Sequence, residues 1–267
     1  MTTITCYELG LRCGMAYFDD KKRNSKKVTE LPDLRTKKIV EESRKSFRLS
    51  PSRFPRELYR TVIEKVTKNR KRGPFIATSG LKLDYYLNAS TNFLDKRVSS
   101  DILKIMSYTL EKIVIPSVRE DGVPLCIVGS EMAGGVMVSQ LCCSEFASRT
   151  DCEFVYMRKK RKTSGTCQQL EGPQAITKRD GSSSRMHAIW IDDCLSSGGS
   201  SVEGLDILKR DYNIEIVGML FLIDRHEDRK KVSETRLISN FTALRNVFVC
   251  SVYDMTDISR VIKSELK

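Results

Sequence analysis

Histidine is nearly absent from this chain, since His187 and His226 are the only two among 267 residues. A metal centre built from a cluster of histidines is therefore excluded. The nine cysteines are an odd number and include no Cys-x-x-Cys pair. This argues against a disulfide framework and against a zinc-thiolate site. Most of the cysteines lie in apolar segments, as expected for buried, reduced thiols.

Long hydrophobic runs are also missing. No apolar stretch reaches the roughly 20 residues that a membrane-spanning helix needs. The first residues, Met-Thr-Thr-Ile-Thr-Cys-Tyr, have neither the basic region nor the apolar core of a secretory signal. Together with the reduced cysteines, these absences predict a cytoplasmic protein that does not enter membranes. No internal repeat is visible.

Positive charge is in excess. The formal net charge is +12, and the excess gathers in three stretches, 21–27, 65–72 and 158–162. Such clustering favours an anionic partner, which could be a nucleotide or another phosphorylated small molecule, a nucleic acid or an acidic protein surface. A solvated basic surface is the alternative interpretation.

Two regions differ in pattern. Residues 1–50 predict a basic N-terminal extension with little strand-like alternation and one short amphipathic helix at 39–47. Residues 51–267 alternate between apolar strands and amphipathic helices, which predicts one α/β domain with a mostly parallel sheet and helices on both faces. The expected strands are 74–78, 85–88, 125–128, 154–157, 188–191, 214–223 and 247–252; the expected helices are 55–69, 101–115, 136–148, 202–212 and 255–266.

The most informative segment is 188–201. A short apolar strand ends in Asp192 and Asp193, and a loop of small residues leads directly into a helix. Ligands of open α/β sheets bind at the carboxyl ends of strands, and backbone N–H groups before a helix can hold a phosphate. Carboxylates beside such a cradle suit a ligand that carries sugar hydroxyls as well as phosphate. The loop consists of Ser196, Ser197, Gly198, Gly199 and Ser200.

This pattern resembles the phosphoribosyl-pyrophosphate (PRPP) motif of type I phosphoribosyltransferases. The resemblance implies that Asp192 and Asp193 hold the ribose hydroxyls, and that the loop from Ser196 to Ser200 holds the 5′-phosphate. The alternative is an ordinary Gly/Ser turn that follows a strand with an exposed acid pair.

A second segment, Arg-Lys-Lys-Arg-Lys-Thr-Ser-Gly at 158–165, resembles the catalytic loop of orotate phosphoribosyltransferases. Arg158, Lys159, Lys162 and Gly165 match the family pattern, and Ser164 stands where the family has histidine. The resemblance implies that these cations contact pyrophosphate. Without it, a nuclear-targeting or nucleic-acid-binding patch, or a solvated loop, explains the cluster equally well.

Two more segments extend the resemblance over the part of the chain that precedes the basic loop. Lys82, Tyr85 and Tyr86 match a segment in which a lysine and an aromatic pair close over PRPP and the orotate ring. A tyrosine pair within a hairpin is the alternative. The loop 129–135, with Ser130 and Glu131, resembles the family's pyrophosphate loop and carries alanine at 133, where many members have a polar residue.

Near the C-terminus, Leu-Ile-Asp-Arg at 222–225 matches a family position where arginine binds the orotate carboxylate. Arg225 could bind it through two parallel hydrogen bonds. The alternative is a salt bridge at the strand end, with Asp224 or a neighbour.

The resemblance runs from about residue 55 to the C-terminus. It implies the type I phosphoribosyltransferase fold, with a five-stranded parallel sheet and a small hood. It also implies a homodimer that converts orotate and PRPP to orotidine 5′-phosphate and pyrophosphate. Mg²⁺ would be bound through PRPP and not by direct protein ligands.

Two other functions stay open from the sequence. One is a binding module for nucleotide or nucleic acid, regulatory or part of a defence complex, using the basic extension 1–50. The other is a transferase for a different base.

Overall fold

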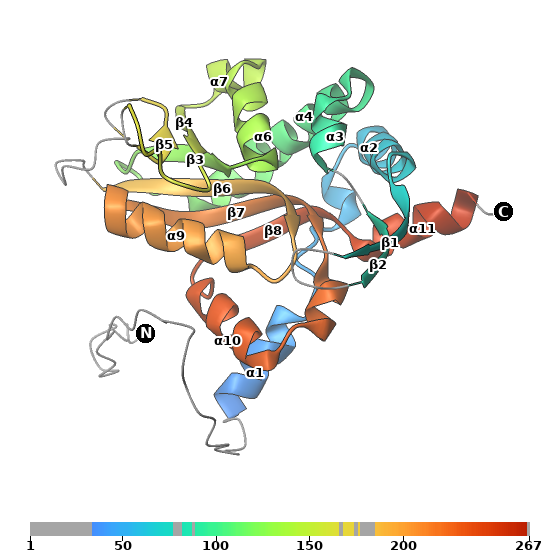
Figure 1. Cartoon of the computed structure of the whole chain (residues 1–267). Helices are drawn as coiled ribbons and strands as arrows, with labels where there is room; N and C mark the ends of the chain where they lie inside the picture. Colours follow the sequence, from blue (N-terminus) through green and yellow to red (C-terminus); the bar gives the residue numbers. More distant parts are fainter. Residues whose placement is uncertain are drawn as a thin grey trace. The chain divides into compact units, whose positions relative to one another are not determined.

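The computed structural model describes residues 34–76, 82–86, 89–165, 168–173, 176 and 185–265. The described residues all belong to one compact unit, Leu34–Lys267 (Figure 1). The domain boundary that the composition predicts after residue 50 stays a prediction. The basic stretch 21–27 lies outside the described residues.

The centre of the fold is a six-stranded sheet with strand order β5-β4-β3-β6-β7-β8. Five strands pair in parallel, as the sequence predicts. A two-residue strand, β5, adds antiparallel to β4 at one edge, and the sequence analysis did not identify it. The bounds are β3 (Leu125–Ser130), β4 (Cys152–Met157), β5 (Leu170–Glu171), β6 (Met186–Leu195), β7 (Ile214–Asp224) and β8 (Phe248–Asp254).

Alternate residues of the central strands face opposite sides of the sheet, because successive side chains of a strand point in opposite directions. Ile189 and Ile191 of β6 belong to one buried cluster, whereas Ala188 and Trp190 belong to another. Both clusters consist of fully buried apolar side chains, which explains why the strands read as continuous apolar runs.

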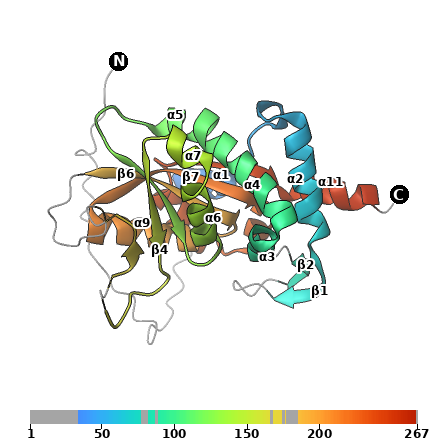
Figure 2. The same cartoon turned by 90° about the horizontal axis from the view of Figure 1, so that it is seen from above.

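Helices cover both faces of the sheet, as Figures 1 and 2 show. The first cluster receives side chains of α2, α4, α6 and α11, and the second receives those of α9 and α10. The sequence predicted these helices except for α10. The bounds are α2 (Arg56–Lys68), α3 (Ala89–Leu94), α4 (Lys96–Thr109), η3 (Leu110–Val114), α5 (Ile115–Val118), α6 (Ala133–Cys142), α7 (Glu145–Arg149), α9 (Gly199–Tyr212), η4 (His226–Lys231), α10 (Glu234–Ala243) and α11 (Met255–Glu265).

A separate hairpin precedes the sheet. β1 (Lys71–Ile76) pairs antiparallel with β2 (Lys82–Tyr86), with a register irregularity between Arg72 and Phe75. The sequence predicted two short strands here, and both are displaced by two or three residues toward the N-terminus. The hairpin stays outside the six-stranded sheet.

Residues 34–50 pack against the C-terminal part of the chain. Figure 1 shows α1 (Leu34–Ser43) beside α10, although the two helices lie far apart in the sequence. Ser251 of β8 donates its backbone N–H to the carbonyl of Phe47 at 3.0 Å and accepts from the N–H of Leu49 at 2.9 Å. This short segment therefore continues the pairing at the free edge of β8.

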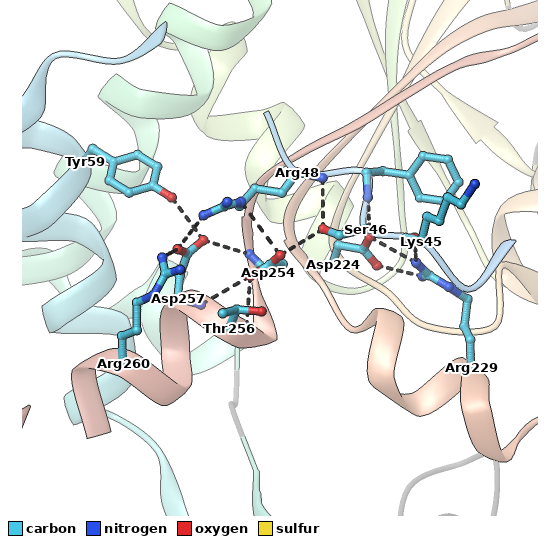
Figure 3. A network of polar contacts seen from close by, with 11 residues as sticks. Lys45, Ser46, Arg48, Tyr59, Asp224, Arg229, Asp254, Thr256, Asp257 and Arg260 are labelled. Atoms are coloured by element: carbon cyan, nitrogen blue, oxygen red, sulfur yellow. Dashed lines mark hydrogen bonds and ion pairs between the residues drawn. The ribbon is translucent and has the colours of Figure 1, made fainter. Parts of the chain in front are cut away.

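A buried ion pair joins this segment to the sheet. Arg229 donates two hydrogen bonds to Asp224, at 2.6 and 3.0 Å, and both side chains are fully buried. Asp224 also accepts the backbone N–H of Phe47 at 2.7 Å, and Arg229 donates to the carbonyl of Lys45 at 2.8 Å. Figure 3 shows the two side chains between residues 45–48 and the end of β7.

The network continues toward α11 (Figure 3). Ser46 donates to Asp254 at 2.9 Å, and Arg48 pairs with Asp257 at 2.6 Å. Tyr59 of α2 donates its hydroxyl to the same Asp257 at 3.0 Å. Burial, reinforced by Asp257, raises the pKa of Tyr59, so the tyrosine stays protonated and serves as a donor. The segment 45–48 is thus held by carboxylates at the ends of two parallel strands.

We expect Arg229→Met to lower the free energy of unfolding by about 3–5 kcal/mol, because it leaves Asp224 buried without its counter-ion. Urea denaturation measures this. The control is Arg60→Met, which breaks an exposed pair with Glu64 and should cost no more than about 0.5 kcal/mol. Equal effects of the two substitutions would contradict the assigned role of Arg229.

Candidate active site

The acid pair lies at the carboxyl end of β6, beside the end of β3. Asp192 and Asp193 are both partly buried. Asp192 accepts the backbone N–H of Asp193 at 2.9 Å and the hydroxyl of Ser130 at 3.4 Å. The structure therefore brings together three residues that the sequence analysis singled out in two separate motifs.

The carboxylate of Asp192 is poorly solvated. Burial raises the pKa of Asp192 well above its usual value, and the neighbouring Asp193 raises it further. An acid pair fully exposed on a turn, the alternative interpretation of this motif, would not have this property. A carboxylate kept in poor solvation beside a like charge gains from a ligand that donates hydrogen bonds to it.

Two carbonyls of the loop 196–200 accept hydrogen bonds from buried side chains. The carbonyl of Ser196 accepts from Arg229 at 3.3 Å, and that of Ser197 accepts from Asn240 at 2.7 Å. In a trans peptide the C=O and the following N–H point in opposite directions. The N–H groups of Ser197 and Gly198 therefore face away from Arg229 and Asn240.

Gly198 gives this loop its shape. Its φ of 79° lies in the left-handed region, which glycine adopts without steric cost. The helix α9 begins at the next residue and has no acidic residue in its first turn. A helix start with available N–H groups and no competing carboxylate is suited to binding an anion.

The start of α6, which follows the loop after β3, packs directly on the backbone of β6. A Cβ at Gly134 would lie 2.5 Å from the carbonyl oxygen of Ile191 and 3.3 Å from Oδ1 of Asp192. A side chain at this position would thus displace the acid pair. Glu131, in the same loop, donates its N–H to Met157 at 2.8 Å and accepts the N–H of Lys159 at 2.9 Å. Glu131 thereby joins this loop to the basic loop.

Cations of the basic loop converge on one carboxylate. Arg158 and Lys162 each lie 2.9 Å from Oε1 of Glu171. The guanidinium of Arg158 also lies 5.8 Å from the ring centre of Tyr156. Lys159, Lys160 and Ser164 are exposed. Arg158 and Lys162 therefore meet at Glu171, and the backbone of Lys159 bonds to Glu131, beyond the carboxyl end of β4.

Arg225 follows the end of β7. Its Nε lies 2.8 Å from Asp228, and its backbone N–H donates to the carbonyl of Leu195 at 2.8 Å. A strand-end ion pair, one of the two interpretations left open by the sequence, is therefore present. Its acid is Asp228 and not Asp224, because Arg229 occupies Asp224.

The remaining predicted residues lie on the hairpin. Lys82, Tyr85 and Tyr86 belong to β2, where the backbone is described and the side chains lie outside the described part of the structure. Their place relative to the acid pair stays a prediction.

Several residues of the site were not found by sequence reasoning. Arg229 and Asn240 support the carbonyls of the 196–200 loop, Asp228 pairs with Arg225, and Tyr156 lies beside Arg158. The one available signal was the Asp-Arg-His-Glu-Asp-Arg run at 224–229, in which charges alternate after a buried strand. Nothing local marks Asn240.

The described residues contain no group of three or more His, Cys, Asp or Glu side chains able to hold a metal ion. Within the same ranges, no helix combines the length and apolar character that a membrane crossing requires. The cysteines among them, at 126, 142, 143, 152, 194 and 250, are all free thiols.

The fold and this site define a class: an α/β protein whose sheet presents an acid pair and a Gly/Ser loop at its carboxyl edge. A family model, the phosphoribosyl transferase domain, matches residues 110–253. The chain belongs to this family of transferases. The matched range contains the acid pair, the 196–200 loop, the basic loop and Arg225.

Similar curated proteins are orotate phosphoribosyltransferases. That of Pyrococcus furiosus is 27% identical over 178 residues, which cover 67% of this chain and 85% of the relative. That of Pyrococcus abyssi is 23% identical over 190 residues, covering 71% and 91%. That of Bifidobacterium adolescentis is 25% identical over 198 residues, covering 73% and 79%.

Solved structures share the fold. Orotate phosphoribosyltransferase of Mycobacterium tuberculosis, in complex with Fe(III) dicitrate, has a TM-score of 0.52 at 18% identity, covering 75% of this chain and 98% of its own. The enzyme of the same name from Aeropyrum pernix has a TM-score of 0.52 at 16% identity, covering 77% and 99%. These matches confirm the predicted type I phosphoribosyltransferase fold.

We expect Asp192→Asn to stabilise the protein increasingly as pH rises. The pKa of Asp192 is raised in the folded state. The free energy of unfolding of the wild type therefore falls as the pH rises from about 3.9, the pKa of an unfolded aspartate, to the raised pKa of the folded state. The asparagine variant lacks this loss. Urea denaturation across pH measures the difference between the two proteins, with the exposed Asp151→Asn as control. A difference that does not change with pH would contradict the argument.

Proposed function

We propose that this protein is a PRPP-dependent phosphoribosyltransferase with orotate as acceptor, forming orotidine 5′-phosphate and pyrophosphate. The observation that carries the proposal is a partly buried acid pair, Asp192 and Asp193, followed by a loop that has two carbonyls already bonded to buried side chains. The names of the similar curated proteins support the choice of orotate.

The acid pair binds the ribose of the substrate, and the loop binds its 5′-phosphate. Asp192 and Asp193 accept hydrogen bonds from the ribose hydroxyls, which relieves the poor solvation of Asp192. The N–H groups and hydroxyls of residues 196–200 bind the 5′-phosphate at the start of α9. Arg229 and Asn240 hold the loop in this conformation through its carbonyls.

The leaving group lies toward the basic loop. The bond between C1′ and a pyrophosphate oxygen breaks and its electron pair leaves with pyrophosphate. The base nitrogen bonds to C1′ and gives up its proton, which the departing pyrophosphate takes up. The charge that develops there is neutralised by four cations, Arg158, Lys159, Lys162 and Lys82. Ser130 and Glu131 belong to the loop that joins the acid pair to the basic loop. Stabilisation of the leaving group and positioning account for the acceleration, so the serine at 164 need not transfer a proton.

The base contacts Arg225, with Tyr85 and Tyr86 for stacking. Magnesium would be bound through PRPP and not by direct protein ligands, because Mg²⁺ keeps several waters and binds substrate phosphates readily. Asp192 and Asp193 would lie next to it, and it would supply charge neutralisation on the pyrophosphate. A homodimer, in which the basic loop serves the neighbouring subunit, completes the proposal.

Turnover tests the proposal directly. We expect loss of orotate absorbance with Mg²⁺ and PRPP, and a decrease in kcat/KM of roughly a hundredfold or more in Asp193→Asn. Thermal unfolding should show that the variant is folded. Absence of turnover by a wild-type protein that binds PRPP in calorimetry would overturn orotate as the acceptor and favour another base.

Arg225→Lys tests the base site. We expect KM for orotate to rise roughly tenfold to a hundredfold, because lysine cannot form two parallel hydrogen bonds to a carboxylate. PRPP affinity should stay unchanged. The matched control is Asp228→Asn, which breaks the ion pair and keeps Arg225. A similar rise in the control would mean that the effect comes from the ion pair and not from orotate.

A further inference from the structure

Glu171 stands out among the acids near the site, because one of its oxygens serves two cations. Arg158 Nε and Lys162 Nζ both lie 2.9 Å from Oε1 of Glu171. Hydrogen bonds from Lys162 and then Arg158 lower the pKa of Glu171, so it is ionised at neutral pH. The proposed function assigns both cations to pyrophosphate and assigns Glu171 nothing.

The backbone of Glu171 is fixed. It pairs with Tyr156 in the β4–β5 ladder, and its neighbour Leu170 is fully buried. The carbonyl of Gln169 accepts the N–H of Arg158 at 2.9 Å, and the side chain of Gln169 donates to the carbonyl of Arg158 at 3.1 Å. The carboxylate is thus held at the base of the loop, where it can reach both cations.

The ion pairs themselves are open to exchange. The side chains of Arg158, Lys162 and Glu171 are 33%, 38% and 37% exposed. Pairs with this exposure are weak, because water solvates both partners. A diphosphate carries more charge and more acceptor oxygens than one carboxylate, so it can take the two cations from Glu171.

We propose that Glu171 is a positioning residue that occupies Arg158 and Lys162 in place of pyrophosphate and releases them when the diphosphate of PRPP binds. The inference rests on the proposed function, because it presupposes that these cations meet pyrophosphate. Glu171 lowers the repulsion between the cations in the free protein. In return, it competes with the diphosphate for them.

This competition has a measurable sign. Glu171→Gln keeps the shape and one acceptor but removes the charge, so the dissociation constants of PRPP and of magnesium pyrophosphate should fall by about threefold to tenfold. KM for PRPP should fall with them, whereas KM for orotate should not change. A residue with a purely structural role would give the opposite result, weaker binding through a disordered loop.

The experiment is calorimetric titration of PRPP and magnesium pyrophosphate into the wild-type chain and three variants. Glu145→Gln is the matched control, since it removes the same charge from an exposed pair with Arg149 on α7. Glu171→Asp keeps the charge but shortens its reach, and we expect it to lie between wild type and Glu171→Gln. Thermal unfolding establishes that each variant is folded.

Tighter binding in Glu171→Gln and unchanged binding in Glu145→Gln would support the inference. Unchanged or weaker binding in both Glu171 variants would overturn it, as would equal tightening in Glu145→Gln, which would reflect net charge alone. Should Glu171→Gln fail to fold, the Glu171→Asp titration decides. Failure of the wild-type protein to bind PRPP would instead reject the proposed function.

Discussion

The buried pair of Arg229 and Asp224 is the interaction on which the site depends. Burying two charges is unfavourable unless each finds hydrogen-bond partners, and here the pair and its partners come from three parts of the fold. Asp224 ends β7, Phe47 and Lys45 come from the N-terminal segment, and Ser196 opens the proposed phosphate loop. The rings of Phe47 and Phe241 lie 5.4 and 5.5 Å from the guanidinium. One cation thus sets the position of three chain segments.

Much of the fold could be predicted because its signals are local. The five parallel strands and the motif around Asp192 and Asp193 are continuous in sequence, so their periodicity and order are visible. The strand β5 has only two residues, too few to show an alternation of apolar and polar side chains. The helix α10 was not predicted, although its apolar residues are buried in the core. The packing of residues 34–50 on β8 could not be predicted, because it depends on partners about 200 residues away.

The same division holds within the site. Sequence reasoning selected residues that would face a ligand, such as Arg158, Lys162 and Arg225, because ligand chemistry constrains their type. The sequence does not indicate that Glu171 pairs with Arg158 and Lys162, and it leaves open which acid pairs with Arg225; in the folded chain these partners, Glu171 and Asp228, lie within 2.9 Å of the cations. A charged site needs both the cations that face the ligand and the acids that pair with them. Without these acids, the cations would repel one another in the free protein.

The segment 45–48 has a consequence for how the chain acquires its structure during synthesis. Its partners Asp224, Asp254 and Asp257 are 177 to 209 residues later in the chain. A ribosome adding roughly 5–20 residues per second needs about ten seconds or more to deliver them. Until then the segment has no partners to bind, and the loop 196–200 lacks the hydrogen bond that Arg229 donates to Ser196. The candidate site therefore acquires this support only after η4 and β8 have been synthesised.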